Sequence, residues 1–265
     1  AGPMTRTVAD AATLLGVLAG RDYSASLDPN GLRGARIGVA RKKVFGYSPE
    51  ADALVEAAID VLRRQGAVIV DPADIPHLGE YDDSELTVLL YELKTDLTGY
   101  LAAWAPNATV KTLADVIAFN EANKAREMPY FGQELFLQAQ EKGPLTDQAY
   151  RDALAKDQRL SRTEGLDVVL AQQNLDAIVA PTGSPPWPTD LVNGDHFLGA
   201  SSTPAAVAGY ASVAVPVGYS FGLPVGMSFI GRANSEATLL RLAFGYEQAA
   251  KPRKPPRFLP QWSPA

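Results

Sequence analysis

The fold is indicated by two segments of this chain, Asp176-Ala-Ile-Val-Ala-Pro-Thr-Gly183 and Ala208-Gly-Tyr-Ala-Ser-Val-Ala-Val-Pro-Val-Gly-Tyr-Ser-Phe-Gly-Leu-Pro-Val-Gly-Met-Ser-Phe-Ile-Gly231. They contain three short apolar runs, at 177–180, 212–215 and 225–230, each bounded by Gly or Pro as buried strands usually are. The segment between the first two runs is rich in Gly, Pro, Ser, Thr and Asn and is too long for a plain turn. Because long loops at strand ends often carry binding sites, two interpretations stay open: a site, or three core strands joined by a surface loop.

A βαβ unit is expected earlier in the chain. Residues 36–40 form a run typical of a strand, and Ser-Pro-Glu at 48–50 is a strong helix start. Gly66 ends that helix, and a second strand is predicted at 67–70. The two strands should be parallel, with a right-handed crossover. The turn at 41–46 lacks a Gly-rich phosphate cradle, so nucleotide binding is not expected.

Further helices are predicted where apolar residues repeat at helical spacing. The first of these helices lies between the Thr7 capping box and Gly20. The others are predicted at 82–104, at 112–124 and at 146–174 with a bend at Gly165, and a last helix begins at 234–236. Glu92 and Lys94 are interpreted as solvated, and the aromatic segment 129–136 as packed rather than leaning over a cleft. The Pro-rich tail 251–265 should run extended along the surface. The expected fold is α/β, part of a large mixed β-sheet flanked by helices on both faces.

Composition excludes several classes of function. The chain has 24 Lys and Arg against 30 Asp and Glu, a net charge of −6 with no dominant basic patch, so nucleic acid is not an expected partner. The absence of Cys excludes disulfides and Cys-based sites and fits a reducing, cytoplasmic location. The only two His residues, His77 and His196, are far apart in sequence, so no His-rich metal site is expected. No run approaches the roughly 20 apolar residues of a membrane span, and no signal peptide is visible.

One catalytic pattern appears in the letters of the sequence. Gly218-Tyr-Ser-Phe-Gly222 matches the G-x-S-x-G nucleophile elbow. That motif requires a helix after the Ser and a His later in the chain, whereas an apolar strand-like run follows here and no His lies beyond His196. The segment is therefore predicted to connect two strands, and Ser220 is not expected to be a nucleophile.

The segments quoted above also resemble a known family. Asp-Ala-Ile-Val-Ala-Pro-Thr at 176–182, followed by Ala-Gly-Tyr, Val-Pro-Val-Gly, Leu-Pro-Val-Gly and Phe-Ile-Gly, is similar to the C-terminal part of amidase-signature hydrolases. Details of 91–101, 127–140 and 241–259 resemble the branch that includes the bacterial peptide amidases. Ser228 departs from the family, where Gln is more usual, and Ala211 stands where Pro often follows Gly-Tyr. Neither change touches a group that the family's mechanism needs.

The resemblance implies an amidase that hydrolyses the carbon–nitrogen bond of amides through a nucleophilic Ser, a bridging Ser on a cis peptide and a Lys. In the family these residues precede a Gly-Pro-Met segment, which here is Gly2-Pro3-Met4. The resemblance therefore implies that 1–265 is the C-terminal portion of a single amidase domain, with the catalytic segment before Ala1. No catalytic residue, metal or cofactor is expected in this chain.

The long loop is expected to contribute a substrate wall, because α/β folds tend to place ligand loops at strand ends. The candidate substrate-binding residues are Thr182, Gly183, Asp195, Ser201 and Ser202. Asp195 has two open interpretations, pairing with a substrate cation or capping a turn. Trp187, which is flanked by Pro, either lines the mouth of a cleft or packs on the surface.

The expected partners are a small amide or peptide-amide substrate and the N-terminal half of the enzyme. A half-domain exposes a sheet edge and an apolar surface, so the isolated chain is expected to self-associate as a homo-oligomer and to hydrolyse no amide. The alternative function is a non-catalytic α/β module that binds a small ligand or a protein partner. The sequence does not distinguish peptide amides, aryl amides and short aliphatic amides as substrates.

Overall fold

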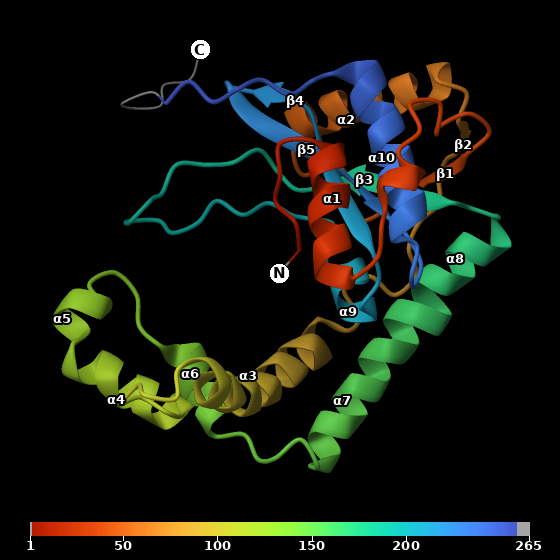
Figure 1. Cartoon of the computed structure of the whole chain (residues 1–265). Helices are drawn as coiled ribbons and strands as arrows, with labels where there is room; N and C mark the ends of the chain where they lie inside the picture. The colour runs from red at the N-terminus through yellow and green to blue at the C-terminus, as the bar shows by residue number, and fades with distance from the viewer. Residues whose placement is uncertain (1, 259–265) are drawn as a thin grey trace. The chain divides into compact units, whose positions relative to one another are not determined.

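The computed structural model describes residues 2–258, and these form two compact units (Figure 1). The first unit combines the described residues of 1–78 and 161–265, and the second consists of 79–160. The sequence did not predict this division. The placement of 1–265 within a single amidase domain stays a prediction.

The first unit is built on a five-stranded sheet with the strand order β2-β1-β3-β5-β4. The strands are β1 Arg36–Val39, β2 Val68–Val70, β3 Ala177–Pro181, β4 Ser212–Ser220 and β5 Leu223–Ile230. β1 is parallel to both β2 and β3, whereas β5 is antiparallel to β3 and to β4. The predicted mixed sheet and the parallel βαβ pair are therefore confirmed.

Helices cover both faces of this sheet, as predicted. They are α1 Val8–Ala19, α2 Pro49–Arg64, α8 Asp167–Gln172, α9 Thr203–Ala208 and α10 Glu236–Ala250, with a short 3₁₀ turn at Ser24–Ser26. Val179 of β3 packs in a core with α1, α2 and α10. Its neighbours Ile178 and Ala180 pack in a second core with α8 and α9. Because successive strand side chains point to opposite faces, β3 is buried on both sides, which explains its continuous apolar run.

The helix starts of the first unit follow their capping residues. Ser48 Oγ accepts a hydrogen bond from the Ala51 amide at 3.2 Å, and Thr7 Oγ1 accepts one from the Asp10 amide at 3.0 Å. Gly20 ends α1 in the left-handed conformation, with φ of 64°. Leu18, which the helical spacing places on the apolar face, is 62% exposed, so the buried stripe of α1 ends before the last turn.

The second unit is helical. Its helices are α3 Asp82–Trp104, α4 Leu113–Ala122, α5 Lys124–Glu127, α6 Glu134–Gln140 and α7 Gln148–Gln158. A wide helical turn, Arg159–Leu166, connects α7 to α8, and Gly165 within it has non-helical angles of φ −107° and ψ −108°. The predicted bend at Gly165 is therefore confirmed. No helix among residues 2–258 is long and apolar enough to cross a membrane.

Two interpretations of side chains in the second unit hold only in part. Glu92 and Lys94 are not simply solvated: Tyr150 Oη donates to Glu92 Oε1 at 2.8 Å, and Lys94 Nζ donates to the Gln140 carbonyl at 2.9 Å. Both side chains are engaged because α3 packs against α6 and α7. In the aromatic segment 129–136, packing is confirmed for Phe136, which contacts the core of Leu90, Leu113 and Ala139, whereas Tyr130 and Phe131 are 68% and 79% exposed and are not packed in a core.

Candidate functional site

The candidate site begins where β3 ends. The Thr182 amide donates to the Gly226 carbonyl of β5 at 2.8 Å, and the Thr182 and Ser228 hydroxyls are hydrogen-bonded at 2.9 Å. An antiparallel bridge then joins Gly183 to Ala200. On one side of this bridge, the Ser201 amide donates to the Thr182 carbonyl at 3.2 Å. The structure therefore brings three predicted residues together, Thr182, Gly183 and Ser201, and these contacts close the base of the long loop.

Ser201 and Ser202 differ sharply although they are adjacent. Ser201 is 1% exposed, and its Oγ has no hydrogen-bond partner within residues 2–258. Ser202 is exposed and directly precedes α9, but its side chain does not cap that helix. Only Ser202 of this pair offers its hydroxyl to solvent.

The long loop carries its own internal contacts. The Trp187 indole Nε1 donates to Asp195 Oδ1 at 3.2 Å, and the Trp187 and Phe197 rings meet edge to face with their centroids 6.2 Å apart. The turn between them is capped by Asp190, whose Oδ1 accepts from the Val192 amide at 2.8 Å. Turn capping therefore belongs to Asp190, while Asp195 holds the indole of Trp187. Pairing of Asp195 with a substrate cation stays a prediction.

A groove that the sequence analysis did not predict lies along β4, the edge strand of the sheet. Its volume is about 920 Å³. Its lining comes from the N-terminal segment and α1, the start of β4, and α10: residues 2–8, Ala11, Leu15, residues 209–216, Glu236, Leu240 and Glu247. The sequence marks one part of this lining, the Gly-Pro-Met segment at 2–4. That this segment lies beside a strand about 200 residues later is visible only in the three-dimensional structure.

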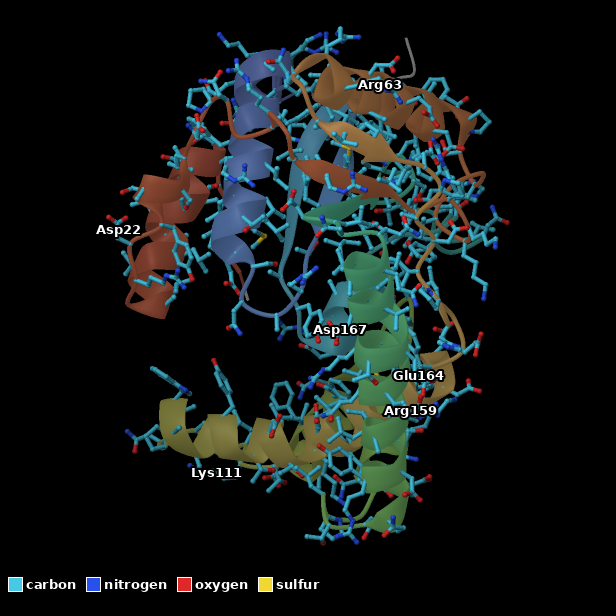
Figure 2. All side chains as sticks on the ribbon, turned by 90° about the vertical axis from the view of Figure 1, so that its right-hand side faces the viewer. Asp22, Arg63, Lys111, Arg159, Glu164 and Asp167 are labelled. Carbon is cyan, nitrogen blue, oxygen red and sulfur yellow. The ribbon has the colours of Figure 1, made fainter. Side chains whose placement is uncertain are left out.

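One end of the groove is anchored by Tyr210. Its hydroxyl donates to the Asp167 carboxylate at 3.0 Å, and Figure 2 labels Asp167 at the start of α8. Burial, followed by the hydrogen bond to Asp167, raises the pKa of the Tyr210 hydroxyl, so it stays protonated at neutral pH. The Arg162 guanidinium lies 6.0 Å from the Tyr210 ring centroid, and its Nε donates to the Ala208 carbonyl at 2.7 Å. These contacts fix the chain where it turns from α9 into β4.

Ser220 has the structural position predicted for it. It is the last residue of β4 and pairs with Leu223, the first residue of β5. The two residues between them, Phe221 and Gly222, both have positive φ, at 50° and 76°, as in a two-residue hairpin turn. The Ser220 side chain is 6% exposed. The segment is therefore a connection between strands, without the helix that a nucleophile elbow requires.

The residue types around the groove limit the chemistry that this part of the chain provides. No Lys and no His line it. Within the described part of the chain there is no cluster of His, Cys, Asp and Glu that could hold a metal ion. The groove offers backbone groups, hydroxyls, apolar surface and the charged side chains of Arg6, Glu236 and Glu247, and none of the predicted residues of the long loop lines it.

Comparisons with known proteins give a consistent result. The family model described as Amidase matches residues 1–240. A probable amidase of Arabidopsis thaliana is 35% identical over 97% of this chain and 50% of its own length. A glutamyl-tRNA(Gln) amidotransferase subunit of Roseiflexus sp. (strain RS-1) is 32% identical over 93% of this chain and 53% of its own length.

A solved structure agrees closely in fold and sequence. The native peptide amidase of Stenotrophomonas maltophilia superposes with a TM-score of 0.89 and 43% identity, over 97% of this chain and 54% of that one. The chain thus spans about half the length of the relatives that it matches.

Proposed function

The chain belongs to the amidase family, and we propose that it is the C-terminal part of an enzyme that hydrolyses the carbon–nitrogen bond of an amide. One observation carries the proposal: 97% of the chain aligns with a peptide amidase at 43% identity and a TM-score of 0.89. That similarity favours a peptide amide or another small amide as the substrate.

In the proposed enzyme the catalytic Ser, the cis-Ser and the Lys lie outside this chain. About half of each relative's length is not matched, which leaves room for such a segment. The groove along β4 supports the placement, since Gly2, Pro3 and Met4 line it. The family resemblance puts the catalytic Ser-rich loop directly before this segment, so the nucleophile would enter the groove from its Gly2 end.

The long loop would form a wall of the substrate site. Thr182, Gly183, Asp195, Ser201 and Ser202 remain the proposed substrate-binding residues. Of the hydroxyls among them, the exposed Ser202 is the one that reaches solvent without rearrangement of the loop, whereas Ser201 would act by holding the loop base.

We further propose that β4 is where the N-terminal half of the enzyme continues the sheet. β4 ends the described strand order, and the nine residues of an edge strand present backbone groups ready for pairing. Without that half, the same edge would pair with a second copy, which is the physical reason for expecting the isolated chain to be an oligomer.

The test is reconstitution. The chain, the polypeptide encoded upstream of residue 1, and a mixture of the two are each assayed for ammonia release from an N-blocked peptide amide. We expect turnover only in the mixture, because the proton relay and nucleophile belong to the upstream part. Turnover by the chain alone would contradict the assignment of the catalytic residues. A mixture that assembles but releases no ammonia from peptide, aryl or aliphatic amides would contradict the amidase proposal itself.

A further inference from the structure

A basic segment follows α10 and is held against the β4–β5 hairpin. Residues 251–257, called here the basic strap, contain four cationic side chains, and no acidic residue follows Glu247 in the sequence. Tyr219 of β4 fixes the strap, because its hydroxyl accepts from the Lys254 amide at 2.7 Å. Lys254 Nζ also lies 5.3 Å from the centroid of the Tyr219 ring. The strap is therefore placed by specific contacts.

The first residues of the strap and the N-terminal segment line a small cavity that is open to solvent. The cavity has a volume of about 280 Å³. Three of its lining residues are cationic, Arg6, Lys251 and Arg253. The apolar part of the lining comes from Val215, Pro216, Tyr246 and Pro252. Burial raises the pKa of Tyr246 to about 12, so the tyrosine adds no negative charge.

No carboxylate among residues 2–258 neutralises these three cations in an ion pair. The one acidic residue of the lining, Glu247, is already engaged: its Oε1 accepts from the Val8 amide at 2.9 Å and its Oε2 from Gln248 Nε2 at 3.3 Å. The lining therefore has an excess of positive charge, in a chain whose net charge is −6.

Local structure explains only one of these charges. Lys251 follows the C-terminus of α10, where the helix dipole favours a cation. Arg6 and Arg253 are exposed residues that no helix end attracts to the cavity, and like charges around it repel each other, although water weakens the repulsion. A bound anion removes this repulsion, and a guanidinium matches the planar geometry of a carboxylate. A cavity of this size suits a small organic group.

We propose that the cavity lined by Arg6, Lys251 and Arg253 binds the carboxylate of an organic acid that occupies the neighbouring groove. The cavity adjoins the β4 groove, since Arg6, Val215 and Pro216 line both. Only the identity of the acid rests on the proposed function: it is either an amide substrate with an acidic side chain or the carboxylic acid that amide hydrolysis releases. The cavity thereby adds a charge preference to the amide chemistry proposed for the groove.

Three probes of nearly the same shape separate these cases. N-acetylglutamic acid α-amide carries a side-chain carboxylate, N-acetylglutamine carries only a terminal carboxylate, and N-acetylglutamine amide is neutral. Binding of each to the 265-residue chain is measured by calorimetry at low salt and again at high salt. We expect at least one charged probe to bind about tenfold or more tightly than the neutral one, and the difference to shrink as salt screens the charges.

Variants locate the site. Arg6→Gln and Arg253→Gln should each weaken the charged probe about tenfold and leave the neutral probe unchanged. Arg64→Gln is the matched control, because Arg64 is an exposed cation in the last turn of α2, outside the cavity. Circular dichroism confirms that each variant is folded.

The outcomes are distinct. Preference for the side-chain carboxylate identifies an acidic substrate, and preference for the terminal carboxylate identifies the product. Equal binding of charged and neutral probes overturns the proposal, as does a loss of binding in Arg64→Gln equal to that in Arg6→Gln. Tighter binding of a short oligonucleotide than of either carboxylate overturns it as well. Because the readout is binding, it stands independently of ammonia release, so failure of the amidase proposal is seen separately in the reconstitution assay.

Discussion

Removing one or the other hydroxyl of the pair at the base of the long loop should destabilise the protein by different amounts. Thr182 Oγ1 and Ser228 Oγ are 2.9 Å apart. Ser228 is 5% exposed, whereas Thr182 is only half-buried. Replacing Thr182 with Val keeps the shape of the side chain but leaves the Ser228 hydroxyl buried without its partner. Replacing Ser228 with Ala leaves the Thr182 hydroxyl within reach of water.

The two single changes should therefore differ in cost. Leaving a buried hydroxyl unpaired costs about 1–3 kcal/mol, so Thr182→Val should fall in that range. Losing the bond while the remaining hydroxyl is hydrated costs about 0.5–1.5 kcal/mol, which is the expectation for Ser228→Ala. The double variant leaves neither hydroxyl unpaired. Its cost should be less than the sum of the single costs by about 1 kcal/mol.

Urea unfolding of all four proteins measures these free energies. The background carries Trp104→Phe and Trp262→Phe, so that fluorescence reports on Trp187, which belongs to the same unit as the pair. An unchanged m value shows that the variants differ in stability and not in the extent of unfolding. Strict additivity of the two changes, or a larger cost for Ser228→Ala than for Thr182→Val, would refute the assignment of the pair.

Other predictions follow from single side chains. Asp195→Ala should lower kcat/KM of the full-length enzyme with little change in Tm if the carboxylate contacts substrate; a fall in Tm with unchanged kinetics would assign it to holding the indole alone. Ser220→Ala should change full-length activity by only a small factor, because Ser220 is the last residue of a hairpin strand. A loss of several orders of magnitude would show that Ser220 is a nucleophile after all. Ser48→Ala should lower the unfolding free energy by about 1 kcal/mol, because it removes the bond to the Ala51 amide. Ser202→Ala, the control without a capping bond, should change stability by less than about 0.5 kcal/mol in the same thermal and urea measurements.

The sheet was predictable because its signals are local. The apolar runs at 177–180, 212–215 and 225–230 are each bounded by Gly or Pro. β3 is a continuous apolar run because both of its faces are covered. The bend at Gly165 was also visible, since Gly is poorly suited to a helix interior. The side-chain errors are of a different kind. Glu92 has its partner on α7, and Lys94 has partners at the end of α6 and just after it; the spacing of apolar residues within α3 does not identify these partners.

The candidate site was predicted only in part for the same reason. Thr182 and Gly183 are marked by the end of a strand, but the partner of Thr182, Ser228, is set by the register of β3 against β5. The role of Asp195 depends on Trp187, which the loop brings back to it. The groove needs the N-terminal segment to lie beside the start of β4, a juxtaposition without any local pattern in the sequence.

The position of the second unit in the chain has a consequence for the order of folding. Residues 79–160 separate β1 and β2 from β3, the strand that completes the parallel part of the sheet. Contacts between segments so distant in sequence form slowly, because closing the long intervening loop costs conformational entropy before the contacts stabilise the chain. On the ribosome, β1 is made before β3 exists, and the edge of β1 that pairs with β3 stays open while α2, β2 and all the helices from α3 to α8 are synthesised. The hairpin of β4 and β5 follows β3 closely, so the last third of the chain can assemble quickly once it emerges. Nascent chains stalled between Leu78 and Ala177 should therefore be the species most exposed to chaperones and to aggregation.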